Sequence, residues 1–310
     1  MKIKNVLSLF DGMACGRLAL EKAKIEFGKY YASEIDKRCI TVAKDNFDDI
    51  VHLGDVQNWR EWELDDIDLI IGGSPCQGFA NQGKRLNFDD PRSKLFFDFV
   101  DILNHYKPKF FLLENVLMSR KQWIEIINQY MGVEGILINS KSVSAQERKR
   151  LYWANWDISQ PPEKNIGLGD ILTSNHDWNA SYIAGRKINP LTQKREDHNP
   201  DIPYTQALHV KNNGDEKAYC LTTVQKDSII SNKPPKSRIP NAFVDLEMGE
   251  DWRYFTPLEC ERLQTLPEGY TKAVSDNQRF KMIGNGWTVD VIVHIFECLK
   301  ADHAKAYKGD

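Results

Sequence analysis

The first 160 residues alternate apolar segments with amphipathic ones. Four segments predict strands, most of them too continuously apolar to leave one face in water: NVLSLF (5–10), KYYASE (29–34), DLIIGG (68–73) and PKFFLLENV (108–116). Three segments between them have a helical period: 16–23, 37–47 and 93–106. Such strands need helices on both faces, so the pattern predicts an α/β fold with a doubly wound, mostly parallel sheet. Ligands of such sheets bind at the carboxyl ends of the strands.

Residues 160–250 have a different composition. They are rich in Pro, Asn, Lys and Asp and poor in periodic apolar patterns. Regular patterns return at FTPLECERLQTLP, where Thr256, Pro257 and Glu259 predict a capped helix start, and residues 288–300 predict a last helix. We therefore expect a main domain over 1–159, a smaller loop-rich lobe with short strands over 160–250, and a segment 251–310 that returns to the main domain.

The charge is unevenly distributed along the chain. The net charge is −3, yet residues 185–240 hold ten Lys and Arg against six Asp and Glu. A local basic face is compatible with nucleic-acid binding, although solvated basic loops have the same composition.

The cysteines and histidines do not follow the spacing of a metal site. Six cysteines are scattered without a C-x-x-C pair, and seven histidines are equally dispersed. This pattern argues against a metal site and a disulfide framework, and it fits a reducing compartment. We expect no membrane partner, because no apolar run is long enough to span a bilayer.

The segment FDGMACG (10–16) stands between the first strand and the first helix, where doubly wound folds bind nucleotide-like cofactors. Gly12 and Gly16 allow a tight turn and close backbone approach. Glu34 lies 22 residues after Gly12, near the spacing of an acid that binds ribose hydroxyls, and Asp55, in HLGDV, follows a further expected strand that lies between residues 37–47 and 68–73. The loop departs from G-x-G-x-x-G and lacks a P-loop lysine, so it favours S-adenosylmethionine over NAD. A turn with helix-capping glycines is the alternative interpretation.

Cys76 lies in GGSPCQGFAN, just after the expected strand DLIIGG (68–73). A free cysteine is usually inert core filler. Here Gly72, Gly73 and Pro75 break the strand and would present Cys76 at the carboxyl edge of the sheet. A polar, glycine-containing segment follows and is typical of a mobile lid. Glu114 ends the next strand and is expected at the same edge.

The order of FDGMACG, PCQ, ENV, QERKR, ECERLQ and GNGW resembles the DNA (cytosine-5) methyltransferase family over nearly the whole chain. SLFDG, GGSPC, KLFFDF, VSAQERKRLYWAN and FTPLECERLQ are also similar to the animal de novo type, while the absence of an extra chromatin-reading module suggests a compact bacterial or phage member. The resemblance implies a Rossmann-like, S-adenosylmethionine-dependent enzyme that methylates carbon 5 of cytosine in DNA. It makes 1–159 the catalytic and cofactor-binding domain and 160–250 the target-recognition lobe.

The resemblance also implies the catalytic roles. Cys76 would add to carbon 6 of a flipped-out cytosine, since carbon 5 alone is too poor a nucleophile. Glu114 would hold or protonate ring nitrogen 3. Arg148 and Arg150, two apart on a strand, would point together at Glu114 and the cytosine carbonyl. Without the resemblance, surface charge would be the favoured explanation of these arginines.

Further residues are assigned by the same resemblance. Glu34 would bind the ribose hydroxyls and Asp55 the adenine amine, while Phe10 and Ile35 would pack on the adenine, although many relatives have an aromatic residue at the position of Ile35. Cys220 stands where relatives often have threonine, and a packed small residue is its simplest explanation. The expected cofactor site is Phe10, Gly12, Met13, Glu34, Ile35, Asp55, Val56, Pro75, Asn285 and Gly286, and the expected DNA contacts are Gln77, Lys84 and Arg85.

The expected partner is double-stranded DNA, with base contacts from Arg or Lys of the 160–250 lobe. A cognate restriction endonuclease is left open, and no particular oligomeric state is implied. The expected location is the cytoplasm of a bacterium or of a phage-infected cell. Two alternatives remain: a tRNA cytosine methyltransferase with the same core, and a silent nucleic-acid-binding paralogue.

Overall fold

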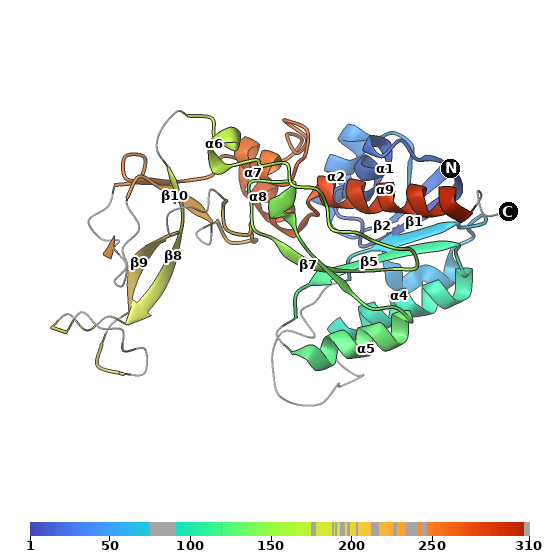
Figure 1. Cartoon of the computed structure of the whole chain (residues 1–310), viewed down its shortest axis with the longest axis horizontal. Helices are drawn as coiled ribbons and strands as arrows, with labels where there is room; N and C mark the ends of the chain where they lie inside the picture. Colours follow the sequence, from blue (N-terminus) through green and yellow to red (C-terminus); the bar gives the residue numbers. More distant parts are fainter. Residues whose placement is uncertain are drawn as a thin grey trace.

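The computed structural model describes residues 1–74, 91–118, 120–174, 178–187, 189, 191–192, 196, 199–202, 204–211, 217–225, 228–233, 241–242 and 247–306. At its centre lies a seven-stranded sheet (Figure 1). The strands in spatial order are β3 (Ile50–His52), β2 (Glu26–Ser33), β1 (Lys2–Leu9), β4 (Leu69–Gly72), β5 (Phe110–Val116), β7 (Lys149–Ala154) and β6 (Ile136–Asn139).

The first five strands of this order pair in parallel, whereas β7 runs antiparallel to both of its neighbours, β5 and β6. Because β7 is reversed, its first residues lie at the edge where β4 and β5 end: Arg150 pairs with Val116. The prediction of a doubly wound, mostly parallel sheet is therefore confirmed.

Helices cover both faces of the sheet (Figure 1). One face carries α1 (Cys15–Lys22), α2 (Lys37–Asn46) and α9 (Val289–Ala306), and the other carries α4 (Pro91–Tyr106) and α5 (Lys121–Met131). Side chains alternate between the two cores, as strand geometry requires. In β4, Leu69 and Ile71 pack in the core beside α1 and α9, while Ile70 packs in the core beside α4 and α5.

A second, antiparallel sheet lies to one side of the first (Figure 1). Its strands in spatial order are β11 (Asn241–Ala242), β9 (Tyr204–Val210), β8 (Asn179–Lys187), β10 (Ile229–Ser231) and β12 (Trp252–Tyr254). At nine and seven residues, β8 and β9 are longer than the short strands that the sequence predicts. A small core of Ile183, Leu208, Ile229 and Trp252 anchors this sheet, so few apolar residues signal it in the sequence.

The chain then returns to the first sheet through α7 (Pro257–Leu263) and α8 (Asp276–Asn285). The predicted start of α7 is confirmed: Thr256 and Glu259 form a capping box and Pro257 is the first helical residue. The short elements are η1 (Val56–Glu61), η2 (Ser140–Ser142) and α6 (Leu168–Ile171). Among the described residues, no helix is long and apolar enough to cross a membrane, and no three His, Cys, Asp or Glu side chains form a metal-binding group.

Candidate active site

A cavity of about 380 Å³ lies at the edge where the parallel strands end. Its walls come from the segments after β1, β2 and β4, from the end of β5, from the start of β7 and from the α8–α9 connection. Ligands of doubly wound folds bind at this edge. The lining residues are Phe10, Asp11, Gly12, Met13, Cys15, Glu34, Asp36, Cys39, Gly73, Ser74, Glu114, Asn115, Val116, Arg148, Arg150, Met282, Gly284, Asn285, Gly286 and Trp287.

The glycine loop, residues 10–16, forms one wall. Phe10, Gly12 and Ala14 all have φ near +60°. This left-handed conformation is easy for glycine and unfavourable for residues that have a Cβ atom. Gly16 lets α1 approach β4 closely, because a Cβ there would lie 2.4 Å from Cδ1 of Ile71. The loop therefore needs glycine for both of the reasons that the sequence suggests.

Glu34, just after β2, holds this loop in place. Its Oε2 accepts a hydrogen bond from the backbone N–H of Gly12 at 2.8 Å, and its Oε1 accepts from the N–H groups of Ile35 and Asp36. A carboxylate has about four acceptor positions, so one position remains toward the cavity. That capacity fits a ligand hydroxyl.

Asp11 gives the cavity an acid whose charge is poorly compensated. Its Oδ1 accepts from the hydroxyl of Tyr30 at 2.7 Å, but its buried Oδ2 has no hydrogen-bond partner. Burial raises the pKa of Asp11 to about 6, and the charge of Glu34 acts in the same direction. A cation in the cavity would relieve this cost.

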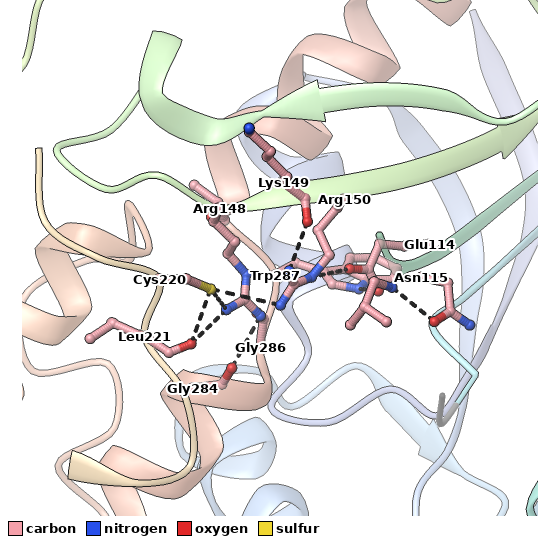
Figure 2. Close-up of polar contacts among 12 residues, drawn as sticks. Glu114, Asn115, Arg148, Lys149, Arg150, Cys220, Leu221, Gly284, Gly286 and Trp287 are labelled. Atoms are coloured by element: carbon pink, nitrogen blue, oxygen red, sulfur yellow. Dashed lines mark hydrogen bonds and ion pairs between the residues drawn. The ribbon is translucent and has the colours of Figure 1, made fainter. Parts of the chain in front are cut away.

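Glu114 lies at the end of β5 with only 9% of its surface exposed. Its Oε1 lies 3.1 Å from Nε of Arg150, and its Oε2 accepts from the indole Nε1 of Trp287 at 3.1 Å (Figure 2). Burial opposes the charge of Arg150, but Glu114 and Cys220 outweigh it and raise the arginine's pKa. Asn115 donates to the backbone carbonyl of Ser74 and so joins the ends of β5 and β4. The contacts with Arg150 and Trp287 anchor both oxygens of the Glu114 carboxylate.

Arg148 has a different environment from Arg150. It precedes β7, is 3% exposed, and donates to the carbonyls of Leu221, Gly284 and Gly286 at 2.9–3.1 Å (Figure 2). Burial lowers its pKa, and the charge of Arg150 lowers it further. The expectation that both arginines point at Glu114 therefore holds for Arg150, whereas Arg148 lines the cavity but uses its N–H groups to join three backbone segments.

Cys220 lies between the two arginines. Its Sγ is 3.3 Å from Nη1 of Arg148 and 4.0 Å from Nη2 of Arg150. The residue is partly buried, and its thiol also contacts the carbonyl of Leu221. It packs within the site's polar network, next to residues 148 and 150.

The predicted cofactor residues and the remaining predicted site residues fall into three groups. Phe10, Gly12, Met13, Glu34, Asn285 and Gly286 line the cavity. Among the described residues, Ile35, Asp55 and Val56 do not: Ile35 is 70% exposed, the Asp55 side chain accepts from the N–H of Gln57 at the start of η1, and Val56 packs in the core beside α4. Outside the described residues lie Pro75, Cys76, Gln77, Lys84 and Arg85.

Sequence reasoning did not single out Asp11, Asn115 or Trp287, although each lies in a quoted motif. The sequence does signal an acid inside the glycine loop and an aromatic residue after GNG. Their contacts, with Tyr30, Ser74 and Glu114, join residues up to 173 positions apart.

The sheet order, the glycine loop and the adjoining acid together define a cofactor-binding enzyme of the methyltransferase fold class. Solved structures support this class. A putative DNA modification methyltransferase encoded within an E. coli prophage and DNMT2 of Spodoptera frugiperda each superpose with a TM-score of 0.62 at 20% identity. They cover 97% and 96% of this chain, and the matches span 99% of each of those chains.

The particular family follows from the sequence. The family model for C-5 cytosine-specific DNA methylases matches residues 4–301, and the chain belongs to this family. It is 30% identical to the type II methyltransferase M1.ScrFI of Lactococcus lactis subsp. cremoris, over 94% of this chain and 77% of that protein. It is 28% identical to M.NlaX of Neisseria lactamica, over 96% of each chain. The protein is a DNA (cytosine-5) methyltransferase, which methylates cytosine in DNA with S-adenosylmethionine as methyl donor.

The cavity fits this cofactor. S-adenosylmethionine carries positive charge and no phosphate, and two acidic residues, Asp11 and Glu34, line the cavity. The two arginines that line it are engaged with Glu114 and with backbone carbonyls. The glycine loop and Glu34 would hold the cofactor, with Asp11 beside its positive charge.

Proposed function

We propose that this enzyme methylates carbon 5 of a cytosine flipped out of duplex DNA, through a transient bond between Sγ of Cys76 and carbon 6. The observation that carries the proposal is the anchored Glu114 carboxylate on the wall of a cavity that the glycine loop also lines. Gly73 and Ser74 line the same cavity, and Ser74 is two residues before Cys76. A nucleophile, an acid and a cofactor loop would then share one site.

The proposed chemistry follows from these residues. The Cys76 thiolate adds to carbon 6 while Glu114, which must carry a proton at this stage, donates it to ring nitrogen 3, so the ring becomes an enamine with a nucleophilic carbon 5. S-adenosylmethionine supplies the methyl group. After methyl transfer, a base removes the carbon 5 proton, the double bond re-forms, the Cys76 thiolate leaves, and ring nitrogen 3 returns its proton to Glu114. Arg150 holds the Glu114 carboxylate and faces the cytosine carbonyl oxygen.

The cofactor contacts of the family are also proposed for this chain. Glu34 binds the ribose hydroxyls, supported by its remaining acceptor capacity toward the cavity. Asp55 binds the adenine amine and Ile35 covers the adenine. The high exposure of Ile35 supports a surface that a ligand covers. The full proposed set is Phe10, Gly12, Met13, Glu34, Ile35, Asp55, Val56, Pro75, Asn285 and Gly286.

The DNA contacts are proposed to come from two parts of the chain. Residues 160–250, which contain most of the second sheet, form the target-recognition lobe, while 1–159 and 251–310 form the catalytic domain. The basic residues of the lobe support phosphate and guanine contacts. Gln77, Lys84 and Arg85 contact DNA around the flipped base.

We also propose a cognate restriction endonuclease as a partner. The names of relatives include type II methyltransferases and an orphan methyltransferase of Bacillus phage rho11s. To test for such a nuclease, methylated and unmethylated DNA are each incubated with an extract of the source cell. Cleavage of the unmethylated DNA alone is the expected result.

Covalent trapping tests the central proposal. Duplex oligonucleotides that carry 5-fluorocytosine at every candidate site, with the cofactor, should give a covalent complex on a denaturing gel. Cys76→Ser should abolish that complex, while Cys298→Ser, a substitution on α9 outside the cavity lining, should leave it unchanged. A wild-type enzyme that methylates DNA but gives no complex would refute the Cys76 adduct.

Two further measurements identify the substrate. Tritium transfer from labelled cofactor is expected into duplex DNA and not into tRNA, and transfer into tRNA alone would favour the RNA alternative. Bisulfite sequencing of DNA from cells expressing the enzyme, beside Cys76→Ser, gives the target sequence. Binding of DNA with no transfer in any assay would identify a silent paralogue.

A further inference from the structure

Trp287 lies between α8 and α9 and connects three walls of the cavity. Its Nε1 donates to Oε2 of Glu114 at 3.1 Å (Figure 2). The far edge of the indole lies beside α1, since a Cβ on Gly16 would be 3.5 Å from its Cζ3. The nitrogen edge lies beside the end of β4, since a Cβ on Gly73 would be 3.1 Å from Nε1. The ring therefore lies beside the glycine loop and the end of β4 and contacts Glu114.

The backbone around Trp287 is held firmly. The carbonyl of Gly286 accepts hydrogen bonds from Arg148 and from the side chain of Gln264. Thr288 donates its hydroxyl to Oε1 of Gln264, and the N–H of Val289 donates to the Gln264 carbonyl. Gln264 is fully buried. The backbone that carries the indole is thus fixed by hydrogen bonds to buried groups, which is one condition for preorganisation.

The carboxylate of Glu114 needs two anchors to have a fixed plane. The last torsion of a glutamate is broad, so contact of Oε1 with Arg150 alone would leave the carboxylate free to rotate about that contact. The indole N–H holds the second oxygen, and hydrogen bonds to charged groups are among the stronger ones. Proton transfer depends on such alignment.

We infer that Trp287 is a positioning residue for the methyl-transfer reaction: its indole N–H fixes the plane of the Glu114 carboxylate and links that plane to the glycine loop. The inference rests on the proposed function, in which Glu114 contacts the target cytosine. Trp287 need not touch the base itself. Its contribution should therefore appear in turnover and disappear when Glu114 is changed.

Substitution of Trp287 by phenylalanine tests the first part. Trp287→Phe keeps an aromatic ring and removes the N–H. We expect kcat to fall by about ten- to a hundredfold, while KM for DNA and for cofactor stays within about twofold of wild type. Trp156→Phe is the matched control, because the Trp156 indole donates to the Ile295 carbonyl at 3.1 Å away from the cavity lining. It should keep the wild-type kcat. A wild-type kcat for Trp287→Phe, or a raised KM with unchanged kcat, would overturn the inference.

A double-mutant cycle tests whether Trp287 acts through Glu114. In a Glu114→Gln background, Trp287→Phe should reduce kcat no further, whereas two reductions that multiply would show an independent role and overturn the inference. Glu114→Gln with the wild-type kcat would instead refute the proposed role of Glu114.

Indole NMR tests the contact without turnover. In protein labelled with ¹⁵N-tryptophan, one of eight indole signals is assigned by its loss in Trp287→Phe. That signal should move in Glu114→Gln, and the Trp156 signal should not. A Trp287 signal that stays in place would overturn the inference even if Glu114→Gln is inactive.

Discussion

Replacement of Asp11 by asparagine should change how the stability of the protein depends on pH. Burial raises the pKa of the Asp11 carboxyl from 3.8 to about 6. Below pH 3.8 the carboxyl is neutral in the folded and unfolded states. The unfolded chain releases this proton near pH 3.8, whereas the native carboxyl keeps it until about pH 6. The free energy of unfolding therefore falls as the pH rises through this range, and above pH 6 the native state contains the buried charge. At pH 7 the loss is about 3 kcal/mol.

Urea unfolding of the cofactor-free enzyme measures this effect. Asp11→Asn removes the titration, so the stability of the variant relative to wild type should rise by about 1–2 kcal/mol between pH 5 and pH 7.5. The side-chain amide of the asparagine takes the place of the unpartnered Oδ2. The cost of burying this amide does not depend on pH, so it cancels when the stabilities at the two pH values are compared. Asp45→Asn, at an exposed position of α2, is the matched control. An equal stability difference between Asp11→Asn and wild type at both pH values would refute the reasoning from burial.

Three other substitutions have defined outcomes. Arg148→Ala removes the guanidinium that joins three backbone carbonyls and should lower the melting temperature, with a loss of about 3–5 kcal/mol in the free energy of unfolding, and Arg148→Lys should not restore it. Gly16→Ala places a methyl group 2.4 Å from Ile71 and should cost about 1–3 kcal/mol in urea unfolding. Burial would raise the pKa of Glu259, but hydrogen bonds, first that of Arg253, lower it to about 2. The ionised Glu259 therefore stabilises the fold above pH 4.5, and this stabilisation is lost as the pH falls toward 2. Glu259→Gln should lower the free energy of unfolding by about 3 kcal/mol at pH 7.

The main sheet was predictable because its strands have a local signal. Leu69–Gly72 and residues 110–113 are apolar on both faces, and only helices on both sides can bury such strands. The β8–β9 pair has no such signal. It is held by a ladder of backbone hydrogen bonds with few apolar residues, Ile183 and Leu208 among them, and backbone pairing leaves little trace in a sequence.

The sequence named several of the residues that line the cavity but not the contacts that they make. The spacing of Arg148 and Arg150 suggests one strand face, but β7 begins at Lys149, so the two guanidinium groups follow different directions. The partners of Arg148 belong to segments more than 70 residues away. Burial of one Asp11 oxygen likewise depends on the whole tertiary fold and not on the FDG motif.

The two walls of the cavity come from opposite ends of the numbering, the glycine loop near residue 12 and the α8–α9 connection near residue 286. All seven strands of the main sheet lie within residues 2–154, so the sheet can assemble on the ribosome while the rest of the chain is being made. The cofactor pocket closes only once residues 282–287 have left the exit tunnel. A nascent chain can therefore complete the sheet before it completes the cavity.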